Sequence, residues 1–195
     1  MMMKKILLLA AVLCAAAACG GRKAPEADPV RDAIVASLLE SDPQLREVRF
    51  ETLSKVDSST VSEELARRVS TFEIRRDQDE RLYSQYARSG KPKNAQLRYD
   101  SLQKDKLVLA GLDSLGEALG ARLGEVAFYE YVFTGRGTGE NYTVIFDEVY
   151  AAVTPDLRVL AVSKKKADLR KTTGRAVPGY EALLRRVPDI EEEAL

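Results

Sequence analysis

Histidine and tryptophan are absent from this 195-residue sequence, and cysteine occurs only twice. The absence of histidine excludes Ser-His-Asp and Cys-His catalysis, histidine-ligated zinc or copper, and pH switches that depend on an imidazole. An enzyme built from this chain would have to use carboxylates, tyrosine, lysine or serine. The composition therefore favours a non-enzymatic protein with no metal or other cofactor, while carboxylate chemistry stays open.

An excess of charge of one sign is also lacking, because 30 basic residues balance 30 acidic ones. Such a balance gives no support to nucleic-acid binding, which depends on a basic surface. Hydrophobic residues make up 45% of the chain. This content, together with the length, is sufficient for one domain with its own core.

Residues 1–18 have the layout of a signal peptide. Two lysines lie near its start, and residues 6–18 form an uncharged apolar run that is too short to span a bilayer comfortably. Three alanines then precede Cys19. We therefore predict that residues 1–18 are removed during export and that Cys19 becomes the first residue of the exported chain.

The residues around Cys19 resemble the lipobox of bacterial lipoproteins, in which the cysteine becomes the first mature residue and carries acyl chains. That family usually has leucine three residues before the cysteine, where this chain has Ala16. An ordinary signal peptidase would also accept the alanines and cut at the same bond, so Cys19 is either acylated or free. We predict the acylated form, because two or three acyl chains hold a protein almost permanently on a membrane. The protein would then lie on the periplasmic or outer face of a bacterial envelope.

The exported chain is predicted to contain no disulfide. Cys14 lies within the predicted signal peptide, and acylation would consume Cys19. Stability must therefore come from a core. Residues 19–28 contain two glycines and a proline, and we interpret them as a flexible tether with a reach of about 30 Å.

The residues after the tether predict an α+β domain over residues 29–163. A helix is expected over residues 29–41, because Asp28 and Pro29 are typical of a helix start. Residues 46–56 alternate between apolar and polar side chains. This alternation predicts a half-buried strand.

Two long helical patterns follow the first strand. Thr60 and Glu63 fit a capping box at the start of the first pattern, and Gly90 and Pro92 mark a turn before the second. Each helix would be about 40 Å long. The charged run at residues 75–81 interrupts the apolar spacing and is expected to be solvated. We predict an antiparallel helical hairpin that is inserted between the first and second strands.

Three further strands are predicted over residues 126–134, 142–153 and 157–163, which are rich in aromatic and β-branched side chains. The glycine-rich residues 135–141 are interpreted as a mobile hairpin loop rather than a phosphate-binding loop, since no helix follows them. Both faces of the sheet carry enough apolar side chains to need cover by helices or by a partner. A basic segment, a short helix and an acidic tail are expected over residues 164–195.

The order of these elements resembles that of small bacterial lipoproteins of unknown function with a cystatin-like α+β domain. The strand VRFETL and the meander FYEYVFT to YTVIFDEVYAAVTPDLRVLAVS carry this resemblance. It covers residues 29–163 and brings no catalytic residues. The predicted fold is therefore an antiparallel, cystatin-like sheet of about four strands, with an N-terminal helix and a long helical hairpin between strands 1 and 2.

Glu130 and Glu148 come nearest to a candidate site. If the second and third strands pair symmetrically about residues 135–141, Glu130 lies opposite Phe146, and the two glutamates lie on a diagonal about 7 to 8 Å apart. Carboxylates so placed can act as acid and base on a glycoside or hold a hard cation. The alternative is that one or both face solvent at the edge of the sheet. The candidate ligand-binding residues are completed by Tyr129, Tyr131 and Asp147.

Two other patterns have plainer interpretations. Ser101 and Lys104 form S-x-x-K, and residues 171–174 read KTTG, which are elements of penicillin-recognising enzymes. The intervening S-x-N element is missing, so chance is the better interpretation. The three lysines at 164–166 either contact anionic lipid head groups or are solvated where the last strand ends.

Together these observations favour a non-enzymatic, membrane-anchored domain that binds an envelope protein or component. One alternative is small-ligand binding or hydrolysis by the tyrosines and carboxylates of the sheet. Another is a structural or oligomer-forming role for the hairpin, because helices with narrow apolar stripes often pair with further helices.

Overall fold

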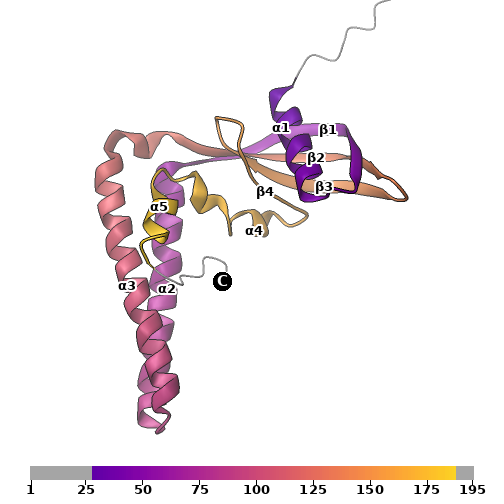
Figure 1. Ribbon diagram of the computed structural model, residues 1–195. Coiled ribbons are helices and arrows are strands. Elements are labelled where there is room, and N and C mark those ends of the chain that lie inside the picture. The colour runs from indigo at the N-terminus through magenta and orange to yellow at the C-terminus, as the bar shows by residue number, and fades with distance from the viewer. Residues whose placement is uncertain (1–27, 188–195) are drawn as a thin grey trace, which may run out of the picture.

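The computed structural model describes residues 28–187 and shows an α+β protein built on one four-stranded antiparallel sheet (Figure 1). Each strand pairs with the next one along the chain, and the helical hairpin is inserted between the first two. The predicted fold class is confirmed. The strands are β1 (Leu45–Thr60), β2 (Val126–Gly139), β3 (Thr143–Val153) and β4 (Val159–Ser163).

The hairpin consists of two helices of 28 residues each, α2 and α3. It projects from one end of the sheet, so that the molecule has the shape of an L (Figure 1). Within residues 28–187, no helix combines the length and hydrophobicity that crossing a membrane requires. The helices are α1 (Pro29–Ser41), α2 (Val61–Arg88), α3 (Pro92–Leu119), η1 (Gly120–Gly124), α4 (Lys166–Leu169), η2 (Thr173–Ala176) and α5 (Tyr180–Leu184).

Local capping fixes where the two predicted helices begin. The Asp28 side chain accepts hydrogen bonds from the backbone N–H groups at the start of α1, and Pro29 occupies its first turn. At the start of α2, the Glu63 N–H donates to Thr60 Oγ1, and the Thr60 N–H donates to the Glu63 carboxylate. Because Thr60 is also the last residue of β1, strand and helix join without a loop.

Two hydrophobic clusters lie on the two faces of the sheet. α1 covers one face, where Ile34 packs with Phe133 and Val149. The other face packs against the base of the hairpin and the C-terminal segment (residues 164–187). The expectation that both faces need cover is therefore confirmed. Buried members of the second cluster include Phe72, Leu112, Phe128, Ala152, Leu169, Val177 and Tyr180.

Charged pairs join α2 to α3 farther from the sheet. Arg75 Nη2 lies 3.2 Å from Asp105 Oδ1, and Arg98 Nη1 lies 2.9 Å from Asp79 Oδ1. Asp105 is fully buried, and Asp79 is 5% exposed. The expectation that residues 75–81 are solvated is therefore wrong for Arg75 and Asp79. Both occupy the helix face that meets α3, so the charged run continues the interior stripe instead of interrupting it.

Residues 135–139 belong to β2 and are not the mobile loop that their glycines indicated. Gly135 pairs with Phe50 of β1, and Gly137 pairs with both neighbouring strands. A Cβ at Gly135 would meet the Arg49 carbonyl oxygen at 2.3 Å. Glycine is therefore needed there for the close approach of β1. The turn to β3 occupies residues 140–142.

Candidate functional site

The predicted register between β2 and β3 is wrong, and with it the predicted pair of carboxylates. Glu130 lies opposite Ala152 rather than Phe146. The turn between β2 and β3 occupies residues 140–142 instead of residues 135–141, and the register also shifts after Phe133. Glu148 is thus four residues along β3 from the partner of Glu130, a separation of about 13 Å along the strand.

The structure separates the five candidate ligand-binding residues. Asp147 and Glu148 are exposed, and Glu148 has a left-handed φ of 52°. Tyr131 is half-buried in the hydrophobic cluster that α1 covers, and burial there raises the pKa of its hydroxyl. Tyr129 is also half-buried, and Lys55 Nζ lies 4.6 Å from its ring centroid. Within residues 28–187, no group of three or more acidic side chains is placed to hold a metal ion.

Glu130 lies in an ionic cluster that joins β2 to the C-terminal segment. It is 1% exposed, with Lys166 Nζ at 2.7 Å and Arg170 Nη2 at 3.1 Å from its carboxylate oxygens. Lys166 also contacts Asp57 of β1 at 3.2 Å. The pKa of Lys166 is raised, mainly because its side chain donates a hydrogen bond to Glu130. Glu130 therefore has two cationic partners within the protein, which favours a structural role.

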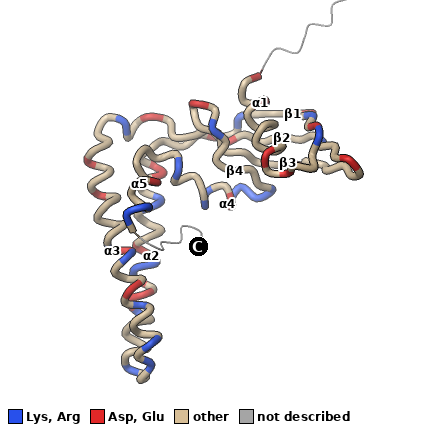
Figure 2. Tube along the Cα trace, in the orientation of Figure 1, with Lys and Arg blue, Asp and Glu red and all other residues tan. Residues whose placement is uncertain are grey.

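The three lysines at 164–166 do not all face solvent. Lys164 and Lys165 are exposed, whereas Lys166 is turned to the ionic cluster around Glu130. Figure 2 shows basic residues gathered near β4 and α4. At most two of these three lysines are therefore available to lipid head groups.

A second buried carboxylate, Glu64, fixes the C-terminal segment to α2. It accepts a hydrogen bond of 2.9 Å from Thr173 Oγ1, and its other oxygen lies 3.0 Å from Arg67 Nε. Arg68 approaches Glu64 at 3.6 Å and donates to the backbone carbonyls of Arg170 and Lys171. The KTTG sequence thus has a structural explanation, since its second threonine binds Glu64. Sequence reasoning did not identify Glu64 and Arg68, although their i,i+4 spacing of opposite charges was a usable signal.

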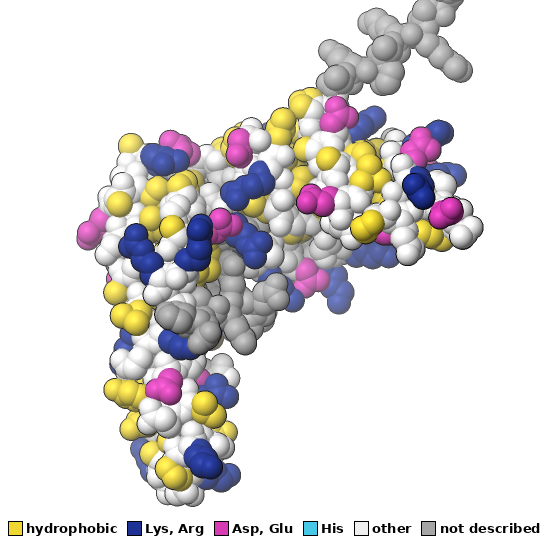
Figure 3. All heavy atoms as spheres, in the orientation of Figure 1, with side chains coloured by type: hydrophobic (Ala, Val, Ile, Leu, Met, Phe, Trp, Pro, Cys, Tyr) yellow, Lys and Arg dark blue, Asp and Glu magenta, His cyan; other side chains and the backbone are white. Residues whose placement is uncertain are grey.

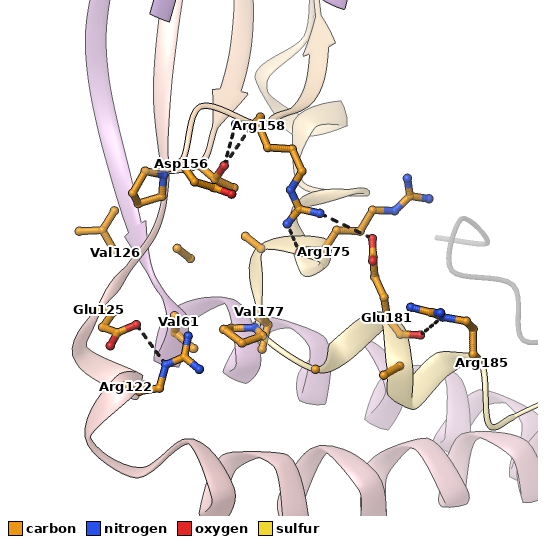
Figure 4. Close-up of a pocket in the computed structure, with 17 residues that line it drawn as sticks. Val61, Arg122, Glu125, Val126, Asp156, Arg158, Arg175, Val177, Glu181 and Arg185 are labelled. Carbon is orange, nitrogen blue, oxygen red and sulfur yellow. Dashed lines mark hydrogen bonds and ion pairs between the residues drawn. The ribbon is translucent and has the colours of Figure 1, made fainter. Parts of the chain in front are cut away.

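A groove of about 480 Å³ lies where η1, the β3–β4 turn and the C-terminal segment meet (Figure 4). Its apolar floor includes the partly exposed residues Val126 and Pro178, and Val61, Ala127 and Val177 are buried at its edge. Four arginines and three acidic residues come from segments far apart in the sequence. Sequence reasoning could not find this site, because no local pattern joins them. The charged lining residues are Arg122, Glu125, Asp156, Arg158, Arg175, Glu181 and Arg185.

Hydrogen bonds and ion pairs link the groove's charged side chains. Arg158 donates a hydrogen bond of 2.9 Å to the carbonyl of Arg175 and lies 3.9 Å from the Glu181 carboxylate. Arg122 Nε lies 3.3 Å from Glu125. A hydrogen bond from the Thr154 side chain is the main cause that lowers the pKa of Asp156, with Arg158 as a weaker one. The groove therefore presents guanidinium groups and carboxylates above an apolar floor.

Comparison with family models, curated proteins and solved structures found no match for this chain. The resemblance to cystatin-like lipoproteins therefore stays a prediction. Cys19, the predicted signal peptide, most of the predicted tether and the acidic tail lie outside residues 28–187.

Proposed function

We propose that this protein is a lipid-anchored envelope protein that binds another protein through the distal half of its helical hairpin. We call residues 74–107 the arm. The proposal rests mainly on the arrangement of side chains in the arm, where charges are buried between the helices and large apolar side chains lie outside. Ile74, Leu97 and Leu107 are 57%, 69% and 62% exposed.

The outer surface of the arm fits a protein partner. Tyr83 and Tyr99 lie side by side on it, with ring centroids 5.7 Å apart, and both are exposed. Figure 3 shows hydrophobic side chains on the outer surface of the hairpin down to its far end. Tyrosines and large aliphatic side chains are typical anchors of protein interfaces.

The ionic interior of the arm is consistent with this role. Buried ion pairs are weak sources of stability, and apolar residues of similar volume often replace them without loss. Their best-attested use is to specify how helices pair. In the arm, the pairs Arg75–Asp105 and Arg98–Asp79 join α2 to α3 at two levels. Both pairs fix the register of the helices that carry the exposed side chains.

The arm is tested by replacing its exposed leucines with glutamate. We expect Leu97→Glu with Leu107→Glu to reduce recovery of a specific partner at least ~10-fold, because each change removes an apolar anchor. The measurement is co-purification with the full-length protein from solubilised envelopes. Ile145→Glu is the control, since Ile145 is 60% exposed and lies on the sheet.

Equal recovery with the arm variant and wild type, or recovery of no specific partner, would contradict the arm as the binding surface. Light scattering on the purified protein shows whether the partner is a second copy, which is the oligomer-forming alternative. The two leucines are exposed in the monomer, so circular dichroism should show unchanged helix content in the variant.

The membrane anchor is tested separately. We expect wild-type protein to incorporate labelled fatty acid in bacterial cells and Cys19→Ala to lose the label, because the thiol and the new N-terminus at Cys19 are where acyl chains attach. The measurement is metabolic labelling followed by purification. Label retained by Cys19→Ala would contradict lipidation at this residue, and it would leave the arm proposal unaffected.

A further inference from the structure

The groove of Figure 4 is a second feature with the properties of a binding site, and it does not include the arm. Its volume of about 480 Å³ lies in the range of small-molecule sites, about 300 to 1,000 Å³. Such sites combine an apolar lining with a few polar groups that fix orientation. Here Val126 of β2 and Pro178 after η2 are partly exposed and contribute apolar surface, and Arg122 and Arg158 supply charge.

The backbone that carries these two arginines is fixed by hydrogen bonds. Arg122 lies in η1, whose following residue, Glu125, accepts from the Val61 N–H at 2.9 Å. Arg158 follows a tight turn in which the Thr154 N–H donates to the Arg158 carbonyl at 3.0 Å, and the Thr154 hydroxyl accepts from the Arg158 N–H at 3.0 Å. The two guanidinium groups are therefore presented from opposite walls of the groove by ordered backbone (Figure 4).

The ion pairs within the groove are weak enough to be exchanged for a ligand. Arg122 and Glu125 have side chains that are 55% and 56% exposed, and the Arg158–Glu181 contact is 3.9 Å long. Exposed pairs of this kind contribute about 0 to 1 kcal/mol. A guanidinium has five N–H donors and binds carboxylate or phosphate through two parallel hydrogen bonds. Arg122 and Arg158 therefore each have N–H donors that can bind an anionic group.

We propose that this groove binds a small ligand with an apolar body and a carboxylate or phosphate group. Arg122 or Arg158, on one wall or the other, binds the anionic group, and the floor that includes Val126 and Pro178 contacts the apolar body. Asp156, on the β3–β4 turn, disfavours a second anionic group at its end of the groove. The predicted binding residues of the sheet, Glu130 and Tyr129 among them, do not line this groove.

The test is calorimetric titration of the full-length protein in lipid nanodiscs, with empty nanodiscs as the blank. The probes are benzoate, phenyl phosphate and inorganic phosphate. We expect saturable binding of benzoate or phenyl phosphate in about the millimolar range, which suits ligands of this size. The tighter of these two probes identifies the preferred anionic group. Inorganic phosphate should bind at least several-fold more weakly than phenyl phosphate, because it cannot use the apolar floor.

A double substitution tests the residues. Arg122→Gln with Arg158→Gln should weaken binding at least ~10-fold, since charge-assisted hydrogen bonds are lost. The matched control is Arg49→Gln with Arg136→Gln, which removes two exposed, ion-paired arginines of the sheet and should leave affinity unchanged. Both double variants should unfold at the same temperature as wild type, because all four side chains are exposed.

The proposal is overturned if neither benzoate nor phenyl phosphate binds saturably, or if the groove variant binds as wild type does. Equal weakening by the control variant would show a general charge effect and would also overturn it. Equal affinity for inorganic phosphate and phenyl phosphate would contradict the role of the apolar floor. None of these outcomes bears on the arm, whose residues are unchanged in every variant.

Discussion

Arg75→Leu is expected to lower the free energy of unfolding by about 3 to 5 kcal/mol at pH 7, the usual effect of removing one partner from a buried ion pair. Asp105 is fully buried, and Arg75 lies 3.2 Å from its carboxylate. Arg75→Leu with Asp105→Leu should restore stability or raise it above wild type by about 1 to 4 kcal/mol, because no charge is then left buried at this level. The measurement is urea denaturation followed by circular dichroism.

The neighbouring Arg76 provides a control for the loss of an arginine. It pairs with Asp77 on the surface of α2, so Arg76→Leu should change stability little. If the double variant at 75 and 105 were as unstable as Arg75→Leu, the pair itself would be stabilising. That result would contradict the view that the charges specify helix pairing at a cost in stability.

The same pair predicts how wild-type stability depends on pH. Burial raises the pKa of Asp105 from 3.8 to about 6, and nearby Asp79 adds to the rise while Arg75 opposes it. The folded protein therefore takes up a proton at this site at a higher pH than the unfolded chain does. Stability should increase as the pH falls from 7 to 4, by about 2 kcal/mol in all and by about 1 kcal/mol between pH 7 and pH 5.

The double leucine variant lacks this increase, and the comparison isolates Asp105 from other groups. Asp57, Glu63 and Asp156 have lowered pKa values in the folded protein. Their contributions are present above their ordinary values and are lost only at more acidic pH, below about 4.5. An equal pH dependence in wild type and the double variant between pH 7 and pH 5 would exclude Asp105 as its origin.

Arg68→Leu is expected to lower the free energy of unfolding by a similar amount, about 3 to 5 kcal/mol. Glu64 is fully buried, and the Arg68 side chain beside it is only 4% exposed. The substitution would therefore leave the Glu64 carboxylate without its buried cationic partner. The carbonyls of Arg170 and Lys171 would also lose a donor. Unpaired buried acceptors add to the loss of stability.

Arg67 is the matched control, because it contacts the same carboxylate with a side chain that is 34% exposed. Arg67→Leu should cause a clearly smaller loss, since water can replace its contact. Hydrogen exchange should locate the effect of Arg68→Leu in residues 164–187, which Arg68 fixes to α2. Equal losses for Arg67→Leu and Arg68→Leu would show that burial does not decide the effect.

Elements with local signals could be predicted from the sequence. The helix start at Asp28 and the capping box of Thr60 and Glu63 are short-range hydrogen-bond patterns, and the structure contains both. The alternation in β1 is equally local. The glycines at 135–139 misled the prediction, because glycine marks a turn and a close approach of strands alike. Only the position of β1 against Gly135 distinguishes the two.

The candidate sites depend on contacts that a local pattern does not contain. Asp105 finds Arg75 thirty positions away, so an isolated charged run was interpreted as solvated. Glu130 pairs with Lys166 and Arg170, which lie beyond the next two strands of the chain. The groove assembles η1, a turn and the C-terminal segment, and its arginines have no common spacing. Composition alone excludes histidine chemistry, and a contiguous motif predicts the anchor at Cys19, which stays a prediction.

The direct join of β1 to α2 also has a consequence for the order in which the chain folds. Thr60 pairs with Val126, 66 positions later in the chain, so this strand pairing would be slow if it had to close an open loop. The hairpin between them brings its two ends together, with the Val61 N–H 2.9 Å from the Glu125 carbonyl. Once α2 and α3 have associated, β1 and β2 need only zip from that junction towards Gly139. The register of α2 against α3 thus also determines which residues of the two strands meet first.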